Sequence, residues 1–207
     1  MKINQVGRSM VEMLGVLAII GVLSVGSIAG YSKAMMKYKI NKSIEQISQL
    51  VANIRTIYAQ QKNYEGLDEK ALIKRNIIPD GLVTLSADPY IMNLFGGKIE
   101  VENYDKNEVG DKGSFIIYFH GIPSAACIDL ATQNWGGSVN DGLIYVASRK
   151  NRNNGFTTDV HVGCKGVKSE REVVACVGGS NVSMPMTVDN VADMCKNENT
   201  LLQLKFF

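Results

Sequence analysis

A run of twenty residues without charge, MLGVLAIIGVLSVGSIAGYS, extends from Met13 to Ser32. At the helical rise of about 1.5 Å per residue it spans about 30 Å, the thickness of the hydrocarbon core of a bilayer. The run is longer than the apolar segment of a secretory signal peptide, which has about 7–15 residues. The sequence therefore predicts a single helical membrane span.

Basic residues flank this run on both sides. The tendency of positive flanks to stay in the cytoplasm leaves the orientation ambiguous or even inverted, because more basic residues follow the run than precede it. Those that precede it are Lys2 and Arg8, and those that follow it are Lys33, Lys37, Lys39 and Lys42.

An acidic residue, Glu12, stands at the leading edge of the apolar segment, two residues after Met10. An unpaired charge at depth in a bilayer costs roughly 2.5–3.5 kcal/mol on insertion scales, so an acid placed here needs a partner and marks a candidate functional site. The alternative interpretation is an interfacial acid that the dipole of the helix amino terminus favours.

The residues Gly7-Arg8-Ser9-Met10-Val11-Glu12, followed by the apolar run, closely resemble the class III leader of type IV prepilins. The resemblance implies that a prepilin peptidase cuts between Gly7 and Arg8 and that the new amino terminus at Arg8 is N-methylated. The fifth residue of the mature chain is glutamate in that family, and Glu12 occupies this place. A seven-residue leader on the cytoplasmic side would put the body of the protein outside the cytoplasm.

The chemistry of a new amino terminus gives Glu12 a partner. A free α-amino group has a pKa near 8, carries positive charge at neutral pH and is costly to bury alone. Glu12 can neutralise it. The resemblance implies that the amine of one subunit pairs with Glu12 of its neighbour, which would set the axial stagger of the packed helices.

A helical period of apolar residues continues beyond the predicted span to about Gln61. It predicts one helix from about Ser9 to Gln61, apolar in its first half and amphipathic in its second. A coiled coil over residues 40–58 is the rival interpretation, but the repeat covers fewer than three heptads. The recurring positions are Ile40, Ile44, Ile47, Leu50 or Val51, Ile54, and Ile57 or Tyr58.

The pattern of residues 63–207 predicts an α+β head. A short helix is expected over Leu67–Arg75, and another over Ser124–Asn134 with Ser124 as its amino-terminal cap. Tyr64-Glu65-Gly66-Leu67 and the helix after it resemble the loop that follows the first helix of type IVb pilins. Segments rich in β-branched and aromatic residues predict strands at Ile99–Tyr104, Ser114–His120, Gly142–Ala147, Thr158–Val162, Val173–Val177 and Leu201–Phe207.

Four cysteines, all in the predicted head, favour two disulfides in an oxidising compartment, with three connectivities formally open. The resemblance to type IVb pilins implies a bond between the short helix and the segment before the last strand, which would join Cys127 to Cys195. Cys164 would then pair with Cys176. No cysteine or histidine spacing fits a zinc site, so no metal site is predicted.

Candidate chemistry elsewhere is sparse. The formal net charge of +2 supplies no general field for nucleic acid, and whether nucleic acid is a partner is unknown from the sequence. The basic cluster Arg149, Lys150 and Arg152 is typical of a solvated loop. His120 lacks an accompanying nucleophile motif, and no phosphate-binding glycine loop occurs. The sequence predicts no enzymatic activity and no cofactor.

The fold class expected is α+β, the type IV pilin fold implied by the resemblance. One long amino-terminal helix would pack on an antiparallel sheet, and disulfides would stabilise the head. The organisation is a leader peptide at residues 1–7, a membrane and filament-core helix at 8–32, the amphipathic half of the helix at 33–62 and the head at 63–207.

The function predicted is that of a structural subunit of a type IV pilus, of the type IVb branch, used for adhesion, aggregation, motility or conjugation. Its partners would be other pilin subunits, the prepilin peptidase and N-methyltransferase, the inner membrane before assembly, and the pilus assembly machinery. The subunit would first span the inner membrane with its head outside the cytoplasm and then enter an extracellular pilus. The alternatives are a minor pilin, a type II secretion pseudopilin, a single-pass membrane-anchored exoplasmic binding module, and a secreted enzyme.

Overall fold

The computed structural model describes residues 10–61, 63–104, 113–135, 142–150, 172–176, 188, 191–192, 195–196 and 200–206. The side chains of residues 104, 144–145, 147–150 and 172–176 are not included in this description. The chain divides into two units, residues 1–39 and 40–207, which are described separately.

In the first unit the described residues are helical. They belong to α1, which runs over Met10–Tyr58 and ends in a turn closed by a hydrogen bond from Gln61 N to Tyr58 O of 2.9 Å. Side chains from residue 10 to residue 34 are exposed, and the most apolar window of α1 has a mean hydropathy of 2.2 with none of it buried. By length and composition α1 is thus long and apolar enough to cross a membrane.

Three serines lie in this apolar stretch, and each donates its hydroxyl to the backbone carbonyl four residues earlier. The hydroxyl groups of Ser24 and Ser27 lie 2.7 Å from their acceptors and that of Ser32 lies 3.0 Å from its own. Because these donors are satisfied within the helix, the serines do not oppose its placement in a medium without water.

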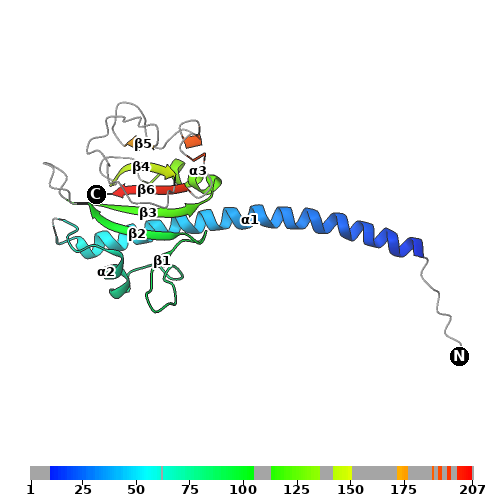
Figure 1. Ribbon diagram of the computed structural model, residues 1–207, viewed down its shortest axis with the longest axis horizontal. Coiled ribbons are helices and arrows are strands. Elements are labelled where there is room, and N and C mark those ends of the chain that lie inside the picture. Colours follow the sequence, from blue (N-terminus) through cyan, green and yellow to red (C-terminus); the bar gives the residue numbers. More distant parts are fainter. Residues whose placement is uncertain are drawn as a thin grey trace. The chain divides into compact units, whose positions relative to one another are not determined.

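The second unit is built on a six-stranded antiparallel sheet with the spatial order β1-β2-β3-β6-β4-β5 (Figure 1). The last strand in the chain, β6, therefore lies in the middle of the sheet, between β3 and β4. Every described side chain of β6 is buried. The strands are β1 (Ile91–Met92), β2 (Lys98–Tyr104), β3 (Ser114–Ile122), β4 (Leu143–Lys150), β5 (Glu172–Cys176) and β6 (Thr200–Phe206).

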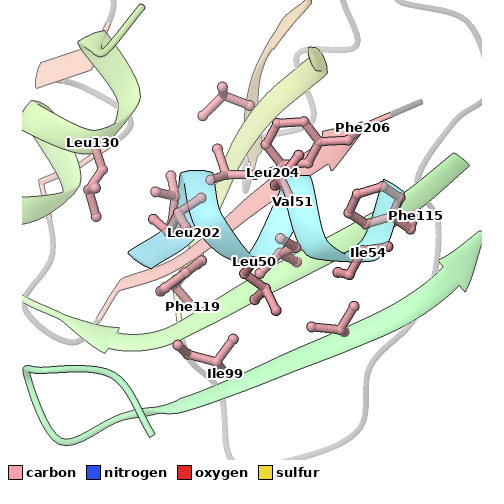
Figure 2. Packing of buried hydrophobic residues seen from close by; sticks show 14 of the residues in the cluster. Leu50, Val51, Ile54, Ile99, Phe115, Phe119, Leu130, Leu202, Leu204 and Phe206 are labelled. Atoms are coloured by element: carbon pink, nitrogen blue, oxygen red, sulfur yellow. The ribbon is translucent and has the colours of Figure 1, made fainter. Parts of the chain in front are cut away.

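Residues of α1 from Ile40 onward pack on one face of this sheet and form the core of the second unit. Figure 2 shows Leu50, Val51 and Ile54 of the helix pointing among side chains of β2, β3 and β6. The predicted apolar period is confirmed, and the structure decides its open positions: Leu50 and Val51 are both buried, and Tyr58 is 3% exposed whereas Ile57 is 38% exposed. The strand residues facing the helix in Figure 2 include Ile99, Phe115, Phe119, Leu202, Leu204 and Phe206.

The predicted α+β class, a long amino-terminal helix with an antiparallel sheet, is confirmed. Five of the six predicted strands have counterparts within a few residues, and the sixth, Thr158–Val162, lies outside the described residues. The two-residue strand β1 was not predicted, because a segment this short carries no alternation of apolar and polar residues.

Two short helices accompany the sheet, α2 (Glu69–Lys74) and α3 (Ser124–Thr132), close to the predicted ranges. Asp68 caps α2 by accepting the Ala71 N–H at 2.6 Å. The prediction that Ser124 caps α3 is wrong, because Pro123 occupies the cap position and makes no side-chain cap bond. The carbonyl of Pro123 accepts the Cys127 N–H at 3.0 Å, so Ser124 is already the first helical residue.

Candidate assembly site

The predicted assembly residue, Glu12, lies in the first turn of α1 and is exposed. A carboxylate in this place is favoured by the helix dipole. Its helical neighbours are large exposed apolar side chains, among them Met10, which is 85% exposed, and Val11. Gly7 and Arg8, the predicted cleavage and methylation residues, lie outside the described residues, so both modifications stay predictions.

The surface of the helix around and beyond Glu12 is apolar on every side. Exposed large apolar side chains recur at nearly every position that is not glycine, alanine or serine, and at 3.6 residues per turn they surround the helix axis. A helix that is apolar all round needs lipid or protein around it. The residues are Val11, Met13, Leu14, Val16, Leu17, Ile19, Ile20, Val22, Leu23, Val25, Ile28 and Tyr31.

Four glycines interrupt this apolar surface, at Gly15, Gly21, Gly26 and Gly30. A Cβ added at any of the four would meet nothing within 4 Å, so no contact with the described residues requires glycine there. Glycine costs roughly 1 kcal/mol relative to alanine in a helix interior. Small residues on a membrane helix allow a second helix to approach closely, so these positions are suited to contact with another helix.

In the head, a disulfide joins Cys127 of α3 to Cys195, which precedes β6 in the chain. Both cysteines are fully buried, and their Cα atoms lie 5.7 Å apart across a sequence separation of 68 residues. This bond is the pairing that the resemblance implied. The other predicted pair stays a prediction, because Cys164 lies outside the described residues and the side chain of Cys176 in β5 is not described.

A chain of ion pairs in the head links α2 to β2 and β3. Lys98 Nζ lies 3.0 Å from Glu69 Oε2 and 3.0 Å from Glu100 Oε1, and His120 Nε2 lies 3.0 Å from Glu100 Oε2. Glu69 also accepts the backbone N–H of Ile91 at 3.0 Å, which attaches β1 to α2. The sequence predicted no catalytic role for His120 and did not reveal the cluster, because its four residues come from three elements.

The electrostatics of this cluster favour its charged form. The hydrogen bond from His120, together with that from Lys98, outweighs burial and lowers the pKa of Glu100 to about 2. Burial lowers the pKa of Lys98, but hydrogen bonds to Glu69 and Glu100 more than offset it, so the pKa lies above its ordinary value. This cluster holds α2, β2 and β3 together, and its role is structural.

An aromatic cluster fastens the carboxyl end of α1 to the sheet. The ring centroids of Tyr64 and Phe115 lie 4.7 Å apart, and those of Tyr58 and Tyr64 lie 5.5 Å apart. Arg55 lies over the Phe206 ring at 5.8 Å. Burial raises the pKa of the Tyr64 hydroxyl, and Arg55 offsets part of that rise. These contacts are packing contacts in the core and at its edge, and they indicate a structural role for these residues.

The described part of the chain shows little that could hold a small ligand. A cavity of about 10 Å³ between α1 and the sheet, lined in part by Ser43, Gln46 and Asn93, has room for one water molecule at most. Among the described residues no group of three or more His, Cys, Asp or Glu side chains could hold a metal ion. The strongest candidate site is therefore the exposed apolar helix with Glu12.

Comparison with known proteins identifies relatives of this chain. The model of the Bundlin family matches residues 33–163, which is more than half of the chain. The major structural subunit of the bundle-forming pilus of Escherichia coli O111:H- is 28% identical over 145 residues, covering 70% of this chain and 73% of that protein. The crystal structure of TcpA, a type IV pilin from the Vibrio cholerae El Tor biotype, covers 81% of this chain and 98% of its own, with 16% identity and a TM-score of 0.49.

Proposed function

The chain belongs to the Bundlin family, and from this premise we propose that it is a structural subunit of a type IV pilus. The relative from E. coli is itself the major structural subunit of a bundle-forming pilus. The observation that carries the proposal is the exposed apolar surface of α1 that follows Glu12, from residue 13 to residue 32, in a chain whose head is tied by a disulfide. The role is structural, as the sequence predicted when it indicated no enzyme.

Polymerisation through α1 follows from the cost of exposing this surface to water. Each valine, leucine or isoleucine stabilises by about 1.5–3 kcal/mol when it is moved from water to a fully apolar environment. Before assembly the membrane supplies that environment, and in an extracellular filament only the helices of other subunits can supply it. Extracted subunits therefore stay associated.

Glu12 decides the register in this proposal. Moving an apolar helix from lipid to a bundle of helices changes its hydrophobic energy little, so close packing and polar pairing select the arrangement. In the proposed filament the α-amino group of Arg8, exposed by cleavage after Gly7, pairs with Glu12 of a neighbouring subunit. Breaking a buried ion pair by removing one partner costs about 3–5 kcal/mol.

The proposal includes a pathway for the chain. The subunit spans the inner membrane with its leader, residues 1–7, in the cytoplasm and its head outside. A prepilin peptidase removes the leader and the amino terminus is methylated, and the assembly machinery then adds the subunit to an extracellular pilus.

The test of processing is intact mass and amino-terminal sequencing of material sheared from cells, with a strain lacking the prepilin peptidase alongside. We expect a chain that begins at Arg8 to dominate the filaments and to disappear in the peptidase-deficient strain. A cleaved chain in trace amounts would assign a minor pilin or pseudopilin role. An uncut chain that remains in the membrane would refute the proposal in favour of an anchored binding module.

The test of register is the Glu12→Ala variant, which we expect to be inserted and cleaved but absent from filaments. Glu12→Asp keeps the charge and should assemble at least in part. The matched control is Glu45→Ala, another exposed glutamate of α1, whose carboxylate contacts Lys42 and Gln49 of the same helix. Normal filaments from Glu12→Ala would contradict the role given to this residue.

A further inference from the structure

Five of the six hydroxyl side chains in α1 share one arrangement, in which the hydroxyl donates to the backbone carbonyl four residues earlier. The distances between donor and acceptor oxygens lie between 2.7 and 3.0 Å. This bond satisfies a helical hydroxyl without any group from outside the helix. The five residues are Ser24, Ser27, Ser32, Ser48 and Thr56.

The sixth hydroxyl residue, Ser43, departs from this arrangement. It is 3% exposed, and its hydroxyl oxygen has no hydrogen-bond partner among the residues that the structure describes. A buried hydroxyl without a partner is costly, because it loses the hydrogen bonds that water gives it in the unfolded chain. The great majority of buried polar side chains are therefore bonded either to protein or to ordered water.

The side chain of Ser43 lines a small cavity between α1 and the sheet. The volume of this cavity is about 10 Å³, and a single buried water needs about 10–15 Å³. Five of the eight lining residues are apolar, and three of them, Leu50, Ile99 and Phe119, are labelled in Figure 2. The described residues that line the cavity include no charged side chain, so its size and its lining suit a small neutral molecule.

Two buried amide side chains, Asn93 and Gln46, supply further polar groups to the cavity. Asn93 lies between β1 and β2 and donates one Nδ2 proton to the carbonyl of His120 at 2.8 Å. Its Oδ1 accepts two backbone N–H groups of the turn that follows, at 2.9 and 3.1 Å. An amide nitrogen carries two protons, so Asn93 can donate the second to a group in the cavity.

Gln46 completes the set of polar groups from the helix side. Its Nε2 donates to the carbonyl of Asp80 over a long distance of 3.4 Å, and its Oε1 is an acceptor. A buried water typically makes about three hydrogen bonds, whereas a cavity with only apolar walls stays dry. Ser43, Gln46 and Asn93 together offer three polar groups.

We propose that this cavity binds one ordered water molecule, which joins Ser43 of α1 to Asn93 beside the sheet. The water accepts the second Nδ2 proton of Asn93, donates a proton to Gln46 Oε1 and forms its third bond with the Ser43 hydroxyl. The contact between helix and sheet thus contains one hydrated polar point within an apolar core. The site needs neither cleavage nor polymerisation, so it does not depend on the proposed function.

The direct test is a crystal structure of the full-length chain in detergent, at a resolution that shows ordered water. We expect one water peak within about 2.7–3.2 Å of both Ser43 Oγ and Asn93 Nδ2. A cavity without such a peak would overturn the proposal. Rotation of the Ser43 hydroxyl onto the carbonyl four residues earlier would overturn it as well, because Ser43 would then follow the other five hydroxyl residues.

The second test compares the melting temperatures of Ser43→Ala and Ser48→Ala in the full-length chain. Ser48 is the matched control, because it is an exposed serine of the same helix whose hydroxyl donates to the carbonyl of Ile44 at 2.9 Å. Both replacements gain the same helix propensity, so the difference between them reports the environment of the hydroxyl.

The two interpretations of Ser43 predict opposite signs in this comparison. If a water bridges Ser43 to Asn93, Ser43→Ala should melt about 2–4 °C below Ser48→Ala, the shift expected when one hydrogen bond is lost from a domain of this size. If the hydroxyl is buried without a partner, its removal relieves a cost. Ser43→Ala would then melt at or above Ser48→Ala, and that result would overturn the proposal.

Discussion

The disulfide between Cys127 and Cys195 should supply a large part of the stability of the head. It connects α3 to the segment that precedes β6, and β6 occupies the middle of the sheet. The perturbation is Cys127→Ala, Cys195→Ala and the double variant. Alanine is chosen because both positions are fully buried, and a serine hydroxyl would have to find a hydrogen-bond partner there.

The magnitude follows from the length of chain that the bond closes. The sequence separation is 68 residues, and in the chain-entropy model a loop of that size restricts the unfolded state by about 4 kcal/mol at 25 °C. Natural domains have free energies of unfolding of about 5–15 kcal/mol, so the loss is a substantial fraction of the total.

The assay is guanidinium unfolding of the full-length chain in detergent under non-reducing conditions. The single tryptophan, Trp135, is a well-placed fluorescent probe, because its indole N–H donates to Leu130 O of α3 at 2.9 Å. All three variants remove the same bond, so each should lower the free energy of unfolding by about 4 kcal/mol. The loss in the double variant should therefore be close to that in each single variant and far below their sum.

Two results would refute this reasoning. A loss below about 1 kcal/mol in either single variant would mean that loop closure does not govern the stability of the head. Losses in the single variants that add up in the double variant would mean that the two cysteines act independently. Peptide mapping without reduction checks the premise, and a peptide that links Cys127 to Cys164 would contradict the pairing itself.

Further predictions concern the ion pairs, the core and one close backbone approach. Because the pKa of Glu100 is lowered to about 2, its carboxylate stabilises the fold fully above about pH 4.5, and this contribution is lost as the pH falls toward 2. After allowance for solvent screening, Glu100→Gln should lower the free energy of unfolding by about 1–2 kcal/mol at pH 5.5, with the difference from wild type vanishing near pH 2 in urea titrations; a difference independent of pH would contradict this. Leu50→Ala should lower the free energy of unfolding by about 2–5 kcal/mol in chemical unfolding, because Leu50 is fully buried against the sheet. The control is Ile57→Ala in the same helix, which should cost clearly less because Ile57 is 38% exposed. Gly97→Ala should lower the melting temperature, because the new Cβ would overlap the backbone carbonyl of His120, and an unchanged melting temperature would show that the backbone at Gly97 and His120 can move apart without cost.

Much of the secondary structure could be predicted because its signals are local. The apolar steps of three and four from Ile40 to Tyr58 anticipate which face of α1 is buried, and β2, β3 and β6 coincide closely with apolar and β-branched segments. The cap of α3 was mispredicted because serine and the preceding proline compete for adjacent positions, and only the observed dihedral angles show that Pro123 takes the cap.

The candidate site was predicted unevenly. Glu12 and the apolar run are contiguous in the sequence, so one stretch of residues is enough to locate them. The ion-pair cluster was missed because Glu69, Lys98, Glu100 and His120 come from three elements, and charges separated along the chain do not reveal that they meet.

The sequence by itself determined the features whose cause is local: a span without charge, a carboxylate at its leading edge, lysines at its far end and an amphipathic continuation. Tertiary structure alone decided the features that need distant residues to meet. It placed the last strand, β6, between β3 and β4, and it shows the Cys127–Cys195 bond, which the resemblance implied but the cysteine spacing alone left open among three connectivities. The hydrophobic period and the charge pattern can be detected from residues that are close in the sequence. Strand order and cysteine pairing depend on how segments far apart in the sequence pack against each other.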